Sequence, residues 1–245
     1  MTPEQAQEIA RLRAANVAPK QIARQLGLRP AEVSNFIREQ AAETSLTRAE
    51  KGELLPLERC LINENAAKRL LNPKPGFLKG LLRRDQSSDV ENDGVGGLAQ
   101  IFVTRMDRNQ YLMCSYLVDY WCLGVKDASG PRKLDRYKYE AMLKQTENNF
   151  HQSYQEISLR EAQAIIFGAI DYAAKLGIQP HADFEQAKAN LGPRLDDLPA
   201  IEFGRDGKPF YISGPYDNPD KIIRKLEDAV GKGNFNFLIG GPPGF

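Results

Sequence analysis

The sequence predicts an α+β protein in which a small all-α module of three helices, residues 1–45, precedes a larger domain, residues 46–245. Three observations support this prediction. The chain has 245 residues, which is long for one compact domain. Its first part holds three short helical patterns separated by turn residues. The remainder combines hairpin patterns with amphipathic helical patterns, which predicts a mostly antiparallel sheet with packed helices.

Composition narrows the class of protein. The 33 basic and 32 acidic residues leave no overall excess of positive charge, so any attraction to nucleic acid must be local. The three cysteines lie in no CxxC pair, which favours a reducing cytosol. The N-terminus lacks the apolar core of a signal peptide, and no apolar run approaches the ~20 residues of a membrane span. We therefore expect a cytoplasmic protein that does not contact membranes.

Capping and turn residues delimit the three helices of the first module. Thr2 is a suitable N-cap for the first helix. A second helix follows Pro19 and ends at Gly27, a residue that can take the positive φ of a sharp turn. Pro30 opens a third helix, which we expect to run through Glu39.

Ala23, Gly27 and Val33 follow one another at intervals of four and six residues. This spacing resembles the helix-turn-helix family, which places a small residue, a turn glycine and a β-branched residue in this order. The resemblance covers residues 19–38, or about 2–39 with the first helix. The core positions of that family fall on apolar residues, namely Ile22, Leu26, Leu28, Phe36 and Ile37. The resemblance implies a tri-helical fold whose third helix enters the major groove of DNA.

Several outward-facing residues of this module are of the types that contact DNA. Arginine and asparagine read the edges of guanine and adenine, serine contacts phosphate or base, and basic residues on the preceding helix hold the backbone. The predicted DNA-binding residues are Lys20, Arg24, Arg29, Ser34, Asn35 and Arg38. Residues 1–42 contain six basic and four acidic side chains, a small excess for a DNA-binding module. Docking of a protein or dimerisation is therefore an alternative role.

The segment from residue 66 to residue 84 is the most basic in the chain and contains no acidic residue. It is either a solvated face or a source of additional phosphate contacts. These candidate contacts are Lys68, Arg69, Lys74, Lys79, Arg83 and Arg84. The acidic, glycine-rich residues 85–97 that follow predict an exposed, mobile loop.

The larger domain shows strand and helix patterns in alternation. The expected strands are 60–62, a hairpin of 98–106 and 111–125, a second hairpin of 201–203 and 210–212, and 234–239; the expected helices are 132–150, 158–176 and 219–230. The segments 118–127 and 173–184 resemble those of an uncharacterised bacterial protein family, and this resemblance implies no activity.

One group of residues has the chemistry of a metal site. Asp119 lies in a strand that is apolar on both faces, so its carboxylate needs a partner or a role. His181 and Asp183 could bind a metal together with Asp119 or Asp171 and support phosphodiester cleavage. The alternative is that Asp183 stabilises a helix N-terminus while His181 packs or caps.

The leading hypothesis is a cytoplasmic DNA-binding protein and candidate transcriptional regulator, without a cofactor, whose α+β domain senses a ligand, dimerises or docks a partner. The first alternative is a metal-dependent nuclease that uses Asp119, His181 and Asp183 for catalysis. The second is an adaptor in which both domains bind protein. The sequence favours a non-enzymatic role without deciding it.

Overall fold

The computed structural model describes residues 1–15, 17–51, 53–72 and 96–239. The chain forms two compact units, Met1–Leu54 and Leu55–Phe245. No helix within the described ranges is both long and apolar enough to cross a membrane. Most of the loop predicted at 85–97 lies outside these ranges.

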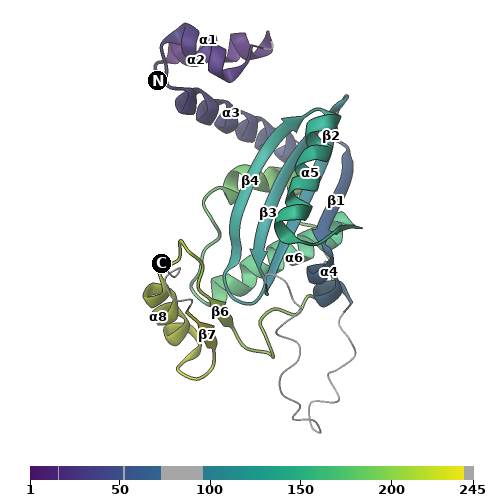
Figure 1. Cartoon of the computed structure of the whole chain (residues 1–245), viewed down its shortest axis with the longest axis vertical. Helices are drawn as coiled ribbons and strands as arrows, with labels where there is room; N and C mark the ends of the chain where they lie inside the picture. Colours follow the sequence, from purple (N-terminus) through teal and green to yellow (C-terminus); the bar gives the residue numbers. More distant parts are fainter. Residues whose placement is uncertain (16, 52, 73–95, 240–245) are drawn as a thin grey trace. The chain divides into compact units, whose positions relative to one another are not determined.

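The N-terminal unit consists of α1 (Pro3–Ala14), α2 (Pro19–Leu26) and α3 (Pro30–Glu50) (Figure 1). A capping box begins α1, in which the Thr2 side chain accepts a hydrogen bond from the backbone of Gln5. The sequence-based end of the third helix at Glu39 was wrong. The helix continues to Glu50 because residues 40–50 contain no glycine or proline and include several strong helix formers.

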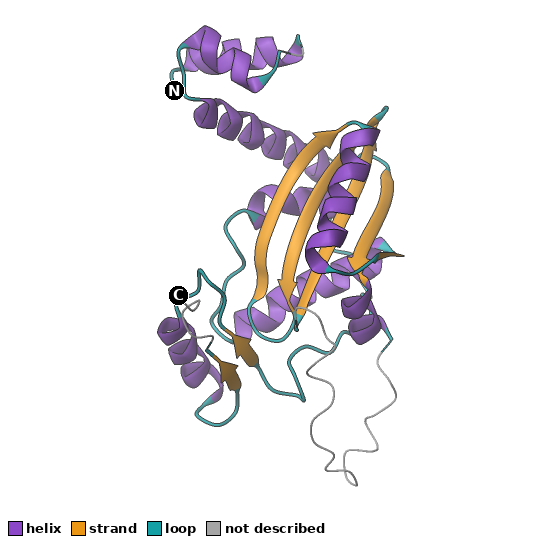
Figure 2. Cartoon of the chain, viewed as in Figure 1, coloured by secondary structure: helices purple, strands orange, loops and turns teal. Residues whose placement is uncertain are grey.

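The C-terminal unit is built on a five-stranded antiparallel sheet with the order β4-β3-β2-β1-β5 (Figure 2). The strands are β1 (Leu57–Asn63), β2 (Leu98–Asp107), β3 (Gln110–Asp119), β4 (Gly124–Leu134) and β5 (Tyr154–Ile157). The hairpin predicted near residue 110 is confirmed, with Asp107 opposite Gln110 and Arg108 at a φ of 58° in the turn between them. The predicted mixed α+β class is likewise confirmed.

Helices cover both faces of this sheet. On one face, α4 (Glu64–Leu71), α6 (Leu159–Lys175) and the short α7 (Phe184–Ala187) bury apolar side chains against the strands. On the other face, α5 (Arg136–Phe150) packs through Tyr139 (Figure 2). As predicted, Ser158 caps the central helix α6 in a capping box. Because both faces of the sheet are buried, the strands carry apolar side chains on both faces.

Two strands were not predicted, β4 and β5. The sequence reasoning extended one strand from residue 111 to residue 125 and began a helix at Arg132. Instead, the chain reverses after Asp119 and returns as β4, and the helix begins at Arg136 after the N-cap Asp135. Glycine and proline within β4 are turn signals, so the sequence there does not resemble a strand.

The predicted hairpin of 201–203 and 210–212 is wrong. Strand β6 (Phe210–Ile212) pairs in parallel with β7 (Asn236–Leu238), and α8 (Pro219–Val230) connects them. Residues 201–203 are not a strand. Their apolar side chains pack on the core of the larger sheet, and Phe203 stacks on Tyr172 with ring centroids 5.7 Å apart.

Candidate functional site

The three N-terminal helices share a small hydrophobic core. Its fully buried members are Ile9, Ile22, Ala23 and Val33. Partly buried side chains from all three helices and their turns surround them, namely Leu12, Val17, Leu26, Leu28, Phe36 and Ile37. Every core position implied by the helix-turn-helix resemblance therefore lies in or against this cluster.

Gly27 makes the turn between α2 and α3 possible. Its φ is 65°, in the left-handed region, and its neighbour Leu28 donates its backbone N–H to the Ala23 carbonyl at 2.9 Å. A side chain at this position would meet no atom within 4 Å, so the backbone conformation alone explains the glycine. The turn brings α3 onto α2 with Val33 facing the core.

The opposite face of α3 is exposed and polar. Ser34, Asn35 and Arg38 are all exposed, and their spacing of three and four residues places them on one side of the helix. The Arg38 guanidinium donates a hydrogen bond to the Asn35 side-chain oxygen. The remaining guanidinium and amide N–H groups are donors, which match the acceptor atoms of purine bases and phosphates.

Arg29 at the start of α3 is engaged with Glu32. Its guanidinium lies 2.5 Å from the Glu32 carboxylate, and its backbone N–H donates to the same carboxylate at 3.2 Å. These bonds lower the pKa of Glu32, with the guanidinium as the larger cause. The acidic residue on the candidate reading helix thus closes the helix N-terminus and is paired with a cation, which reduces its repulsion of phosphates.

The residues predicted to contact the DNA backbone lie partly within the described ranges and partly outside them. Lys20 and Arg24 are exposed on α2. In the basic segment, Lys68 and Arg69 are exposed on α4, where Lys68 pairs with Glu64 at 3.2 Å. The other four members, Lys74, Lys79, Arg83 and Arg84, lie outside the described residues.

Asp119 is separate from the other two predicted catalytic residues. It is 6% exposed, and its carboxylate accepts hydrogen bonds from the backbone N–H groups of Trp121 and Cys122, both at 2.9 Å. Burial raises the pKa of Asp119 to about 6. The two backbone N–H groups are the partners that a carboxylate in an apolar strand requires. By accepting their hydrogen bonds, the carboxylate stabilises the chain reversal between β3 and β4.

His181 and Asp183 do lie together, with Asp127 of β4 beside them in place of Asp119. Candidate ligand atoms of these three residues are within 4.8 Å of one another, and within the described ranges they form the only such group of His, Cys, Asp or Glu. Asp171 instead pairs with Arg194 at 2.5 Å. The sequence reasoning missed Asp127 because it did not predict β4, and no local motif marks this residue.

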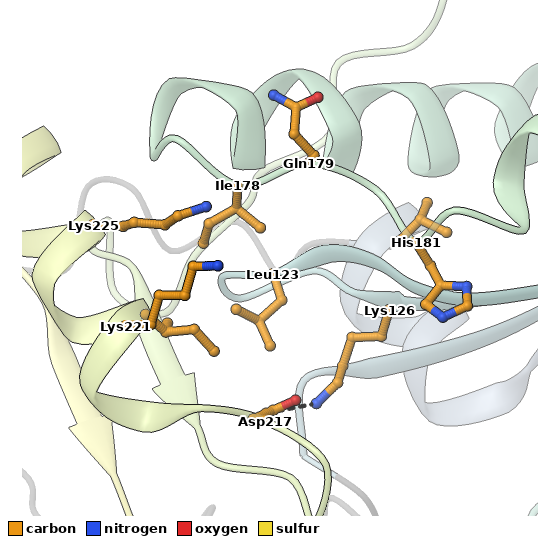
Figure 3. A pocket seen from close by; sticks show the side chains of 10 residues that line it. Leu123, Lys126, Ile178, Gln179, His181, Asp217, Lys221 and Lys225 are labelled. Carbon is orange, nitrogen blue, oxygen red and sulfur yellow. Dashed lines mark hydrogen bonds and ion pairs between the residues drawn. The ribbon is translucent and has the colours of Figure 1, made fainter.

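A pocket of about 200 Å³ lies next to this group, between the start of β4, the segment after α6, and α8 (Figure 3). Its apolar lining includes Leu123 and Ile178, and His181 lies at one side. Lys126 and Asp217 both line the pocket and form an ion pair at 3.1 Å. The pocket combines apolar and basic groups with the carboxylate of Asp217.

Comparison with models of protein families, with curated proteins and with solved structures gave no match for this chain. The two resemblances seen in the sequence therefore stay predictions.

Proposed function

We propose that this chain is a DNA-binding protein whose N-terminal unit contacts the major groove through α3. One observation supports the proposal above the others: the exposed face of α3 presents Ser34, Asn35 and Arg38 on the side opposite the core residues Val33, Phe36 and Ile37. An α-helix fits the major groove, and serine, asparagine and arginine are the residue types that bond to its edges.

In this proposal, α2 holds the phosphate backbone through Lys20 and Arg24, and α3 reads the bases through Asn35 and Arg38. Arg29 contributes less, because its guanidinium must leave Glu32 before it can bind a phosphate. A single module of this size buries roughly 600–1,000 Å² on DNA, which is small for tight binding. We therefore propose that a second copy of the chain binds the same duplex. The stoichiometry of binding at saturation would show this second copy.

The test is fluorescence anisotropy of the full chain with random-sequence duplex DNA across a salt series. We expect affinity to fall steeply with salt, and each of Lys20→Ala and Arg24→Ala to reduce the slope by about 1. Selection from a randomised duplex pool then supplies a preferred site. On that site, Arg38→Ala should weaken binding by about 1–3 kcal/mol, which is roughly 5- to 150-fold.

Arg11→Ala is the matched control. Arg11 is an exposed arginine on α1 that pairs with a glutamate three residues away at 2.5 Å, as Arg29 does just before α3. Arg11→Ala changes the net charge of the unit by the same amount as Arg38→Ala and leaves the α3 face unaltered. If the unaltered chain binds no duplex at low salt, or if Arg11→Ala and Arg38→Ala weaken binding equally, the proposed interface is wrong.

A further inference from the structure

Three metal-ligating side chains on the C-terminal unit come from two segments far apart in the sequence. Asp127 belongs to β4, whereas His181 and Asp183 belong to the connection between α6 and α7. The His181 Nδ1 and Asp127 Oδ1 atoms are 3.9 Å apart, and one candidate ligand atom from each residue lies within 4.8 Å of the others. All three side chains are at least partly exposed, so solvent ions reach them.

The backbone holds the two segments together. His181 donates its backbone N–H to the Val125 carbonyl at 2.9 Å, which ties its segment to β4 two residues before Asp127. Asp183 directly precedes Phe184, a residue that is 5% exposed and packs in the core against Tyr116. Neither attachment depends on the three side chains themselves, so the arrangement exists before any ion binds.

A β-bulge places Asp127 on the surface beside His181. Leu117 pairs with Asp127, but Val118 pairs with Val125, so Lys126 is an additional residue in β4. Without the bulge, Val125 and Asp127 would share one face. With it, Val125 is buried and Asp127 is exposed. Bulges commonly redirect a side chain next to a site.

The His181 nitrogen nearest to Asp127 accepts a hydrogen bond from the backbone. Asp183 donates its backbone N–H to His181 Nδ1 at 3.3 Å. A metal bond at Nδ1 would replace this hydrogen bond. The neighbouring Lys126 is engaged with Asp217, so it does not neutralise Asp127.

We propose that Asp127, His181 and Asp183 bind a divalent transition-metal ion, for which Zn²⁺ is the suitable probe. One imidazole nitrogen and two carboxylate oxygens suit zinc better than magnesium, which prefers oxygen ligands alone. Tetrahedral zinc with bonds of about 2.0–2.2 Å places neighbouring ligand atoms about 3.4 Å apart. The 3.9 Å between His181 Nδ1 and Asp127 Oδ1 requires a side-chain adjustment of about half an ångström, and a pair at the 4.8 Å limit of the group requires about 1.4 Å. Three protein ligands leave one position for water.

The cysteines do not compete for this ion in the folded chain. Cys60, Cys114 and Cys122 are all buried, and burial raises the pKa of Cys60 and of Cys114 to about 12. Their thiolate forms, which are the forms that bind metals, are therefore scarce at neutral pH.

The test is isothermal titration calorimetry of the full chain with Zn²⁺. We expect one binding event that His181→Asn and Asp127→Asn each weaken by more than about 100-fold, because loss of a ligand costs more than the ~10–100-fold loss for an outer-shell partner. The controls are His151→Asn, which alters the other of the two histidines, and Asp206→Asn, whose side chain is 90% exposed. Both controls should bind zinc as the unaltered chain does.

Nuclear magnetic resonance gives a second readout, because the chain has only two histidines. Zinc should shift the imidazole signals of His181 and leave those of His151 in place. Urea unfolding followed by Trp121 fluorescence shows whether each variant is folded. The proposal is overturned if zinc does not bind, if binding survives in folded His181→Asn, or if zinc binds and the His181 signals stay in place, since the last two outcomes indicate binding to residues elsewhere.

Discussion

Replacing Asp119 by asparagine should change how the stability of the C-terminal unit depends on pH. Asp119 ends β3, is 6% exposed, and accepts two backbone hydrogen bonds at 2.9 Å. Asparagine retains an oxygen that can accept both bonds but carries no charge. The two side chains therefore differ mainly in the free energy of burying a carboxylate.

The magnitude follows from the pKa. Burial raises the pKa of Asp119 from 3.8 to about 6, so the folded protein binds this proton more tightly than the unfolded chain does. Stability from this group is therefore present below about pH 4, falls as the pH rises toward 6, and is absent above it. The whole change is roughly 3 kcal/mol, and about 2 kcal/mol of it falls between about pH 4.5 and about pH 7.5.

Urea unfolding of the full chain at these two pH values measures the effect. Trp121 is the only tryptophan, lies in the C-terminal unit and is 7% exposed, so its fluorescence reports on that unit alone. We expect the stability of Asp119→Asn relative to the unaltered chain to rise by about 2 kcal/mol from the lower to the higher pH. Subtracting the stability of the unaltered chain at each pH removes the contribution of other titrating groups, which the two proteins share.

Asp206→Asn is the matched control, because its side chain is 90% exposed and should show no such trend. A stability difference for Asp119→Asn that does not change with pH would refute the raised pKa. A difference that falls as the pH rises would mean that the hydrogen bonds to the ionised carboxylate outweigh its burial.

Three further predictions concern packing, capping and thiol reactivity. Gly124→Ala should destabilise the C-terminal unit by about 2–3 kcal/mol in urea, because φ is 70° there and the new methyl group would lie 2.8 Å from the Ala173 Cβ; no effect would contradict the close approach of α6 to β4. Ser158→Ala should cost about 1 kcal/mol by the same assay, since it removes the capping box of α6, whereas Ser158→Thr should cost less. A chromogenic disulfide should label no cysteine in the native chain and all three in urea, because each thiol is buried; prompt labelling of the native chain would disprove this.

Local chemistry allowed much of the fold to be predicted. The capping boxes at Thr2 and Ser158 and the left-handed turn at Gly27 depend on residues within one helical turn of each other. The same is true of the tight turn that joins β2 and β3 at Arg108. Such features are visible in the sequence because the interacting groups are close along the chain.

Pairing between distant segments could not be predicted in the same way. Strand β4 contains glycine and proline and becomes a strand only because β3 supplies its hydrogen-bonding partner. Strand β6 pairs with β7 rather than with residues 201–203, although apolar side chains of both segments pack against the larger core. In both cases tertiary packing outweighs local propensity.

The two candidate sites differ in the same way, one being set by local sequence and the other by the pairing of distant segments. The α3 face follows from helical periodicity, so Ser34, Asn35 and Arg38 were assigned from the sequence alone. The group of Asp127, His181 and Asp183 was predicted in part, with Asp119 in place of Asp127. Only the tertiary structure makes that choice. The bulge at Lys126 orients Asp127, and the hydrogen bond from His181 to Val125 joins segments more than fifty residues apart in the printed sequence. A side chain's neighbours within a helix are set by its period, whereas its neighbours across a sheet depend on which strands pair.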